Sequence, residues 1–158
     1  MSQEQFEQAV VSITEQLSGQ SLGSGLREFL NREFPPEGDV FQSLAELCRL
    51  GIREGWLCDR EHGGIKFGRI IKPGPDTHGY SVDVVEMENI VGPYHGHPTG
   101  EIDMIIPETD GAEFDGNGQG WLVYGPDSAH APTVSNGRAI VLYLLPDGAI
   151  DFTRAAPE

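Results

Sequence analysis

The sequence predicts a mainly β protein, a sandwich or a small barrel, preceded by an N-terminal helical segment. Two observations support this prediction. Apolar residues recur at helical spacing through the first third of the chain. Beyond residue 55, glycine and proline instead separate short runs rich in Val, Ile, Tyr and Phe at regular intervals. We therefore divide the 158 residues into a helical segment, 1–55, and a β domain, 56–158.

The helical segment contains three predicted helices. The second occupies residues 24–34 and is closed by a pair of prolines. The third begins after Asp39, a favourable N-cap, and ends at Gly55. The first, over residues 3–18, follows from apolar spacings of four, three and four at Phe6, Val10, Ile13 and Leu17.

The β domain contains at least five predicted strands, and their number and spacing indicate a closed or nearly closed barrel. On the first strand, Ile65, Phe67, Arg69 and Ile71 alternate on one face. We interpret the acidic segment 107–120 as an exposed hairpin connection, because it lacks the spacing of an EF-hand calcium loop. The strand sequences are GIKFGRII, YSVDVVEME, EIDMIIP, GWLVYGP and RAIVLYLLP.

The charge composition excludes several classes of partner. The chain has 10 Lys and Arg against 25 Asp and Glu, a formal net charge of -15. Such a charge repels a phosphate backbone, so a nucleic acid partner is not expected. The N-terminus has no basic and apolar leader pattern, and no later run has the length of a membrane span. We expect a cytoplasmic protein with no membrane partner.

Ionisable residues are concentrated after the second predicted strand. Because side chains alternate along a strand, His95 and His97 project the same way, and so do Glu101 and Asp103. The turn at residues 98–100 can fold these two pairs together, and His130 lies in a later turn between two apolar strands. Three imidazoles and one carboxylate suit Fe, Mn, Zn, Ni or Cu, and ligand type alone does not choose among them.

These residues resemble the motifs of the cupin superfamily. The first motif, HxH, three or four residues, then E, matches His95, His97 and Glu101, and its later glycine would be Gly111. The second motif, a Pro-x-Gly-x-x-His turn, is present in altered form, since GPDSAH has its proline displaced and an aspartate where glycine is usual, but keeps His130. The resemblance implies a jelly-roll β-barrel that holds a divalent transition metal on His95, His97, Glu101 and His130.

Arg69 is a candidate substrate-binding residue, because a guanidinium on an apolar strand face requires an anion. If that face lines the barrel, Arg69 can bind a substrate carboxylate in bidentate fashion. The alternative is an internal salt bridge to Asp83 or Glu86.

Other polar residues near these motifs are candidates for catalysis or substrate binding. Asp103 can assist Glu101, face the pocket as an acid or base, or lie at the surface. His78 can act as a general acid or base, although a turn histidine without a role is the simpler interpretation. Tyr80 and Tyr94 are candidate substrate-binding residues, with a surface position as the alternative for Tyr94.

Most of the chain is similar to the bacterial 4-hydroxylaminobenzoate lyase family. The similarity lies in the helical first third and in three later segments, EGWLCDREHGGIKFGRIIKP, HGYSVDVVEMENIVGPYHGHPTGEIDMIIP and GWLVYGPDSAHAPTV. The resemblance implies a carbon–nitrogen lyase that converts 4-hydroxylaminobenzoate and water into 3,4-dihydroxybenzoate (protocatechuate) and ammonia. Glu101 or Asp103 would then move protons. The substrate, a small aromatic carboxylate, would lie among Ile65, Phe67, Val82, Val84 and Ile105.

Two other functions fit the same residues. One is a metal-dependent cupin dioxygenase acting on a small aromatic acid, which oxygen consumption would distinguish from a lyase. The other is a non-catalytic cupin that binds a small molecule. Cupin barrels often pair through their sheet edges, so we expect a homodimer.

Overall fold

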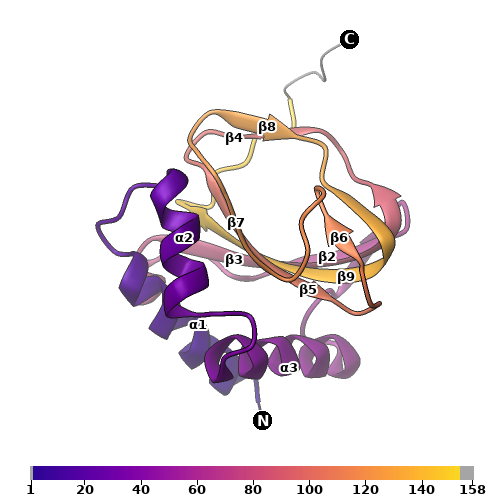
Figure 1. Ribbon diagram of the computed structural model, residues 1–158, viewed down its shortest axis with the longest axis horizontal. Coiled ribbons are helices and arrows are strands. Elements are labelled where there is room, and N and C mark those ends of the chain that lie inside the picture. Colours follow the sequence, from indigo (N-terminus) through magenta and orange to yellow (C-terminus); the bar gives the residue numbers. More distant parts are fainter. Residues whose placement is uncertain (1, 154–158) are drawn as a thin grey trace.

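The computed structural model describes residues 2–153 and shows three helices followed by a curled β-sheet (Figure 1). The predicted fold class, a cupin-type barrel after an N-terminal helical segment, is confirmed. The helices are α1 (Gln3–Leu17), α2 (Ser24–Glu33) and α3 (Asp39–Glu54), and the 3-10 turn η1 spans Pro75–Thr77. The strands are β1 (Arg60–His62), β2 (Ile65–Ile71), β3 (Tyr80–Val91), β4 (His95–His97), β5 (Glu101–Pro107), β6 (Glu113–Phe114), β7 (Gly120–Tyr124), β8 (Ser128–His130) and β9 (Thr133–Pro146).

The strands form two antiparallel sheets. The main sheet has the order β1-β2-β3-β9-β5-β7, with β6 also paired to β9. The long strands β3 and β9 form its centre, and β4 and β8 form a separate pair. In Figure 1 the main sheet curls, the helices cover its outer side, and β4 and β8 lie across the side away from α3. The short strands β4 and β8 therefore close the barrel.

Local sequence explains where the helices begin and end. The Ser2 hydroxyl accepts a hydrogen bond from the backbone of Gln5 at 3.3 Å and caps α1. Gly55, with φ +89°, ends α3 as predicted. The prediction for the start of α3 was wrong by one residue: Gly38 is the N-cap, and Asp39 lies in the positively polarised first turn. In the described part of the chain, no helix is long and apolar enough to cross a membrane.

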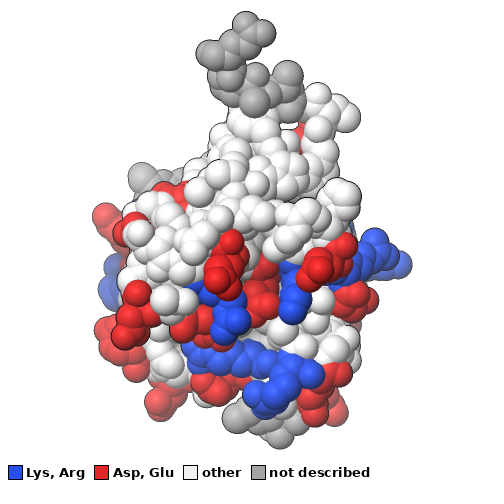
Figure 2. Space-filling model, turned by 90° about the vertical axis from the view of Figure 1, so that its right-hand side faces the viewer, with Lys and Arg blue, Asp and Glu red and all other residues white. Residues whose placement is uncertain are grey.

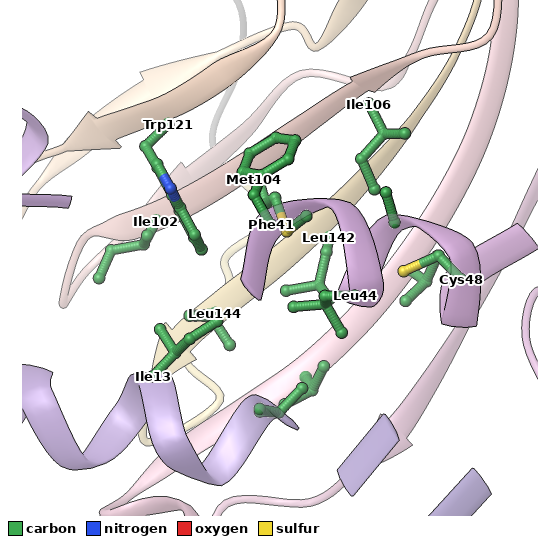
Figure 3. Close-up of a cluster of buried hydrophobic side chains, with 14 of the residues drawn as sticks. Ile13, Phe41, Leu44, Cys48, Ile102, Met104, Ile106, Trp121, Leu142 and Leu144 are labelled. Atoms are coloured by element: carbon green, nitrogen blue, oxygen red, sulfur yellow. The ribbon is translucent and has the colours of Figure 1, made fainter. Parts of the chain in front are cut away.

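Two apolar cores lie on opposite faces of the main sheet. The outer core packs the helices against the sheet, as Figure 3 shows for Phe41, Leu44, Met104 and Trp121. The inner core fills the barrel. Residues of β5 alternate between them, so Met104 faces the helices whereas Ile105 faces the barrel interior. This alternation also directs the acidic residues at the start of β5 into the barrel.

The predicted barrel lining was partly wrong. Ile65 and Phe67 pack against the inner core, as expected. Val82 and Val84 belong instead to the outer core, because the neighbouring inward positions of β3 are occupied by residues such as Val85. Ile71 also leaves the face of Arg69, since a register shift between these two residues turns it toward the helices.

Candidate metal centre

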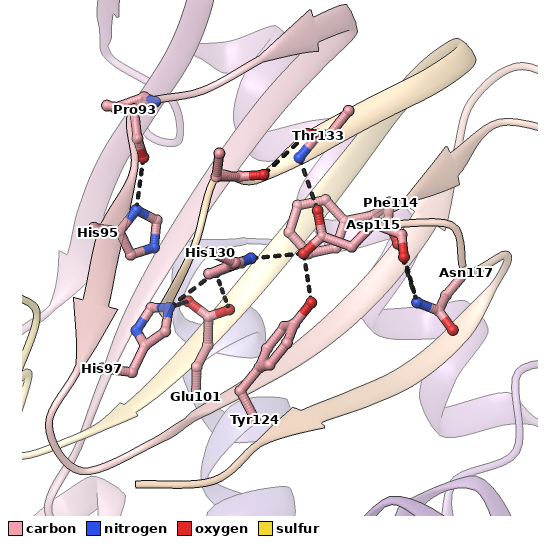
Figure 4. A network of polar contacts seen from close by, with 11 residues as sticks. Pro93, His95, His97, Glu101, Phe114, Asp115, Asn117, Tyr124, His130 and Thr133 are labelled. Carbon is pink, nitrogen blue, oxygen red and sulfur yellow. Dashed lines mark hydrogen bonds and ion pairs between the residues drawn. The ribbon is translucent and has the colours of Figure 1, made fainter. Parts of the chain in front are cut away.

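Four predicted ligands converge inside the barrel. His95 and His97 come from β4, His130 comes from β8, and Glu101 opens β5. One donor atom from each lies within 4.8 Å of the other three, and His97 and Glu101 are almost completely buried. The pairing of β4 with β8 sets His95 opposite His130. Figure 4 shows the His97, His130 and Glu101 side chains pointing toward one another.

A tight turn brings Glu101 back to the histidines. The backbone amide of Gly100 donates to the carbonyl of His97 at 3.1 Å, closing the turn between β4 and β5. Gly100 has φ +91°, and a Cβ there would lie 2.7 Å from the carbonyl oxygen of Tyr124. Only glycine satisfies both conditions without strain, so this residue makes the predicted folding of the two ligand pairs possible.

The donor atoms are arranged as a cation requires. The Nε2 atoms of His97 and His130 face each other at 2.9 Å. The Glu101 carboxylate lies 3.2 Å from His97 Nε2 and 3.4 Å from His130 Nε2. The Nε2 atom of His95 is buried and has no hydrogen-bond partner among the described residues. Converging nitrogen lone pairs beside a buried carboxylate fit a bound metal ion.

Outer partners fix the orientation of two imidazoles. The Nδ1 atom of His95 lies 3.0 Å from the carbonyl oxygen of Pro93, and Nδ1 of His130 lies 2.6 Å from Asp115 Oδ2. A proton on each Nδ1 leaves the Nε2 lone pair free to bind metal. The Asp115 carboxylate also accepts from the Tyr124 hydroxyl at 2.6 Å and from the backbone amide of Thr133 at 2.8 Å.

Asp115 is a site residue that the sequence did not reveal. The segment 107–120 was predicted to be an exposed connection, and that interpretation was wrong for its central part. Phe114 is buried and pairs with β9, which places Asp115, in the left-handed conformation at φ +50°, beside His130. Several acidic residues lie in this segment. No local pattern separates Asp115 from them, because its role depends on a long-range pairing.

The electrostatics of the centre follow from burial and from these contacts. Burial lowers the pKa of His95, which favours a neutral imidazole. Burial also opposes protonation of His130, but its hydrogen bonds to Asp115 and Glu101 prevail and raise its pKa to about 9. For Glu101 and Asp115, burial raises the pKa, but the contacts with His130 and their other donors lower it overall. Both carboxylates therefore stay ionised and favour a cation at the centre, either the His130 imidazolium or a metal ion that displaces its Nε2 proton.

Asp103 lies behind the centre and has no exposed surface. Burial raises its pKa well above the usual range, and the nearby charge of Glu101 raises it further. Asp103 does not line the cavity that reaches His95 and Glu101. The surface position considered from the sequence is therefore wrong, and Asp103 can act on a bound ligand only through Glu101.

A cavity of about 580 Å³ leads from the centre to the surface. Its lining includes His95 and Glu101 of the centre, together with Arg60, Arg69 and Lys72. Its remaining surface is largely apolar, from Phe67, Val85, Met87, Tyr143, Leu145 and Phe152. On the face seen in Figure 2, Lys and Arg side chains gather between acidic residues, below a largely uncharged upper half. An apolar slot with cationic side chains and a polar end suits a flat organic anion.

Arg69 lines this cavity and also makes the salt bridge considered from the sequence. Its Nε and Nη2 atoms donate to the two oxygens of Asp83 at 2.9 and 3.2 Å. Nη2 also donates to the carbonyl of Gly148 at 3.2 Å. Arg69 therefore does both things considered from the sequence: it forms a salt bridge to Asp83, and its guanidinium borders the cavity.

Three other candidates do not lie in the cavity, and their predicted roles are not supported. His78 ends η1 on the outer side of the barrel, where its Nδ1 lies 3.2 Å from the Thr14 hydroxyl. Tyr80 is buried in the outer core. Tyr94 is half-buried next to His95 but does not line the cavity. Tyr94 precedes β4, in the irregular segment that links β3 to it.

Replacing Asp115 by Asn should weaken metal binding about 10- to 100-fold, the usual effect of losing an outer carboxylate partner of a ligand histidine. The amide presents a hydrogen-bond donor as well as an acceptor and cannot hold the His130 ring as the carboxylate does. Competitive titration with a chromogenic chelator measures the change. Glu113→Gln is the matched control, because Glu113 accepts only from Asn136 outside the centre. Equal metal affinity in both variants would contradict this role of Asp115.

Comparisons with known proteins identify relatives of this chain. A family model described as 4-hydroxylaminobenzoate lyase matches residues 8–152. A 4-hydroxylaminobenzoate lyase from Nocardioides sp. (strain LMS-CY) is 31% identical over 158 residues, covering 94% of this chain and 94% of that protein. Another, from Pseudomonas putida, is 31% identical over 146 residues, covering 82% and 83%. Among solved structures, an RmlC-like cupin protein from Ralstonia eutropha is 12% identical, with a TM-score of 0.44 over 61% of this chain and 66% of that one.

Proposed function

Because this chain belongs to the 4-hydroxylaminobenzoate lyase family, we propose that it converts 4-hydroxylaminobenzoate and water into 3,4-dihydroxybenzoate and ammonia. The reaction balances without an external oxidant, because the nitrogen is reduced from the hydroxylamine level to ammonia while the ring is oxidised. The ring gains one hydroxyl beside the nitrogen-bearing carbon and a second in place of the nitrogen. The observation that supports this proposal best is the cavity itself. Its apolar walls connect a buried histidine and carboxylate centre to cationic residues.

We propose that His95, His97, Glu101 and His130 hold a divalent transition metal, such as Fe, Mn, Zn, Ni or Cu. When bound, such an ion supplies Lewis acidity toward the N-hydroxyl oxygen or toward water. Pro93 and Asp115 orient two of the imidazoles for this task. Glu101 lines the cavity, and the carboxylate oxygen that it does not commit to the ion is the chain's own group for moving a proton at the reacting nitrogen or oxygen. Asp103, behind it, positions and supports Glu101.

The apolar walls have two roles in this proposal. Residues from β2, β3 and β9, such as Phe67, Val85 and Leu145, enclose the substrate ring. They also exclude bulk water, which strengthens the interactions of the buried polar groups with the reacting atoms.

The substrate carboxylate would bind at the cationic residues of the cavity. Arg69 is held by Asp83, which leaves a nearly neutral pair, whereas Lys72 has no ion-pair partner among the described residues. A benzoate group approaching Arg69 therefore needs Lys72 to balance Asp83. Together the two cations recognise one carboxylate in an orientation that directs the para substituent inward.

Replacing Arg69 or Lys72 by Gln should raise KM for 4-hydroxylaminobenzoate about tenfold, the effect of losing one partly exposed charge-assisted hydrogen bond. KM for phenylhydroxylamine, which lacks the carboxylate, should barely change. Lys66→Gln is the matched control, because Lys66 is on the same strand as Arg69 but pairs with Glu86 outside the cavity. Equal changes for the two substrates would show that the replaced cations act only on structure.

Incubation of metal-loaded protein with 4-hydroxylaminobenzoate under anaerobic conditions tests the proposed reaction most directly. Ammonia and 3,4-dihydroxybenzoate should form in equal amounts. Loss of activity without oxygen, together with oxygen uptake in air, would favour the dioxygenase considered from the sequence. Ligand binding without turnover under either condition would favour the non-catalytic cupin.

We also propose a homodimeric assembly and a cytoplasmic location, both of which remain predictions. The short strand β1 forms one edge of the main sheet and is exposed along its length. An exposed edge strand can pair with a second copy of the chain. Sedimentation analysis tests the assembly: a species near 34 kDa, twice the 17.2 kDa of one chain, is expected, and a 17.2 kDa species would contradict it.

A further inference from the structure

The described residues after β9 form a short segment that borders the cavity. We call residues 148–153 the C-terminal strap. After β9 the chain reverses at Asp147 and Gly148, both in the left-handed conformation. The amide of Gly148 donates to Leu145 at 3.0 Å, which tightens the reversal. Ile150 and Phe152 then line the same cavity as His95 and Arg69.

The strap is attached to the barrel at two points. At its start, the carbonyl of Gly148 accepts a hydrogen bond from Arg69 Nη2 at 3.2 Å. Toward its end, Asp151 and Gly96 exchange two backbone hydrogen bonds of 2.7 and 2.9 Å. Gly96 lies between the ligands His95 and His97, so the strap pairs with the strand that carries them. The strap therefore runs from a proposed carboxylate-binding residue to the metal centre.

Phe152 is placed unusually for a large apolar side chain. Its side chain lines the cavity, and the residue is nevertheless 59% exposed. The ring centroid lies 5.3 Å from that of His95, with the planes tilted by 58°. A half-covered aromatic ring beside a metal ligand gains contact area when a flat apolar group enters the cavity.

We propose that Phe152 is a specificity-determining residue, whose ring contacts the substrate ring and makes the cavity selective for aryl over saturated carboxylates. This inference rests on the proposed function. A para-substituted benzoate held at Arg69 and extending to Glu101 lies along the strap, with its ring beside Ile150 and Phe152. Phe152 thus positions the ring next to the metal centre without taking part in proton transfer.

Ligand binding tests this role separately from turnover. We would measure the affinities of benzoate and cyclohexanecarboxylate for metal-loaded protein by calorimetry. Unmodified protein should bind benzoate about tenfold more tightly, the scale of one aromatic pair plus its buried area. Phe152→Ala should reduce this preference to about twofold, and Phe152→Tyr should retain it. Val40→Ala, which trims another exposed apolar residue far from the cavity, is the control.

A pair of truncations provides a second measurement. A chain ending at Thr153 keeps the strap, whereas a chain ending at Ala149 removes both Ile150 and Phe152. The longer chain should retain the preference for benzoate, and the shorter chain should lose it. Retained preference in the shorter chain or in Phe152→Ala would overturn the inference, as would equal affinities for the two ligands in unmodified protein.

Kinetics then separate this inference from the proposed function. Phe152→Ala should raise KM for 4-hydroxylaminobenzoate about tenfold while metal content stays unchanged. If unmodified protein fails to turn over this substrate, the proposed function fails, and the binding preference still decides the role of Phe152. If turnover is normal and Phe152→Ala leaves KM unchanged, only the inference about Phe152 fails.

Discussion

Replacing Glu101 by Gln is expected to abolish stable metal binding and lyase turnover together. Glu101 is 1% exposed, and its carboxylate faces Nε2 of both His97 and His130. The glutamine amide is nearly the same size as the glutamate carboxylate but carries no charge. The three imidazoles therefore lose their anionic partner. Metal affinity should fall by more than the 10- to 100-fold typical of an outer partner. Loss of the proton-transferring group should also lower kcat by at least about 100-fold.

Two measurements test this expectation. Mass spectrometry of dialysed protein should find little metal in Glu101→Gln, and a chelator titration gives its affinity. Glu88→Gln, an exposed position on β3, removes the same charge away from the centre and should leave metal content and kcat unchanged. The prediction is falsified if Glu101→Gln binds metal with the affinity of unmodified protein. Normal metal content with lost turnover would instead confine Glu101 to proton transfer.

Replacing Trp121 by Ala should cause the largest loss of stability, about 3–5 kcal/mol in the free energy of unfolding. Trp121, on β7, is 1% exposed and packs edge-on against Phe41 of α3, with centroids 6.0 Å apart. Its indole N–H donates to the carbonyl of Phe34 at 2.9 Å. The substitution leaves a cavity between helices and sheet and removes the donor from the partly buried carbonyl of Phe34. A decrease in Tm of about 10 °C follows for a chain of this size.

Urea unfolding followed by circular dichroism measures this loss. Trp121→Phe keeps a ring in the outer core but removes the indole N–H, so it should cost only about 1–2 kcal/mol. A loss below about 1 kcal/mol in Trp121→Ala would show that the helices contribute little to the stability of the sheet. Because β7 also carries Tyr124, which hydrogen-bonds Asp115, we expect metal affinity to fall in parallel.

The ligand set was predictable because its information is local. His95, His97 and Glu101 lie within seven consecutive residues, in a motif whose strand periodicity and turn determine the relative directions of the side chains. His130 followed from a second turn motif that kept its histidine despite two altered positions. Their convergence within 4.8 Å agrees with that reasoning.

The prediction was weaker wherever one residue of register decides the face. Val82 and Val84 were assigned to the barrel interior, yet they pack against the helices. Alternate residues of β3 share one face of the sheet, but the local sequence does not show which of the two faces points into the barrel. The bulge after Arg69 shows the same limit, because an inserted residue reverses the face of Ile71 without a recognisable sequence mark.

The sequence by itself determined the helical segment, the five longer strands, the four candidate metal ligands and the family of this protein, because each depends on short-range periodicity or on a contiguous motif. Only the tertiary structure decided which partners surround those ligands. Asp115 beside His130, Asp83 on Arg69 and Phe152 beside His95 are all contacts between distant segments. Such contacts depend on strand order and register across the whole sheet, which no local pattern encodes.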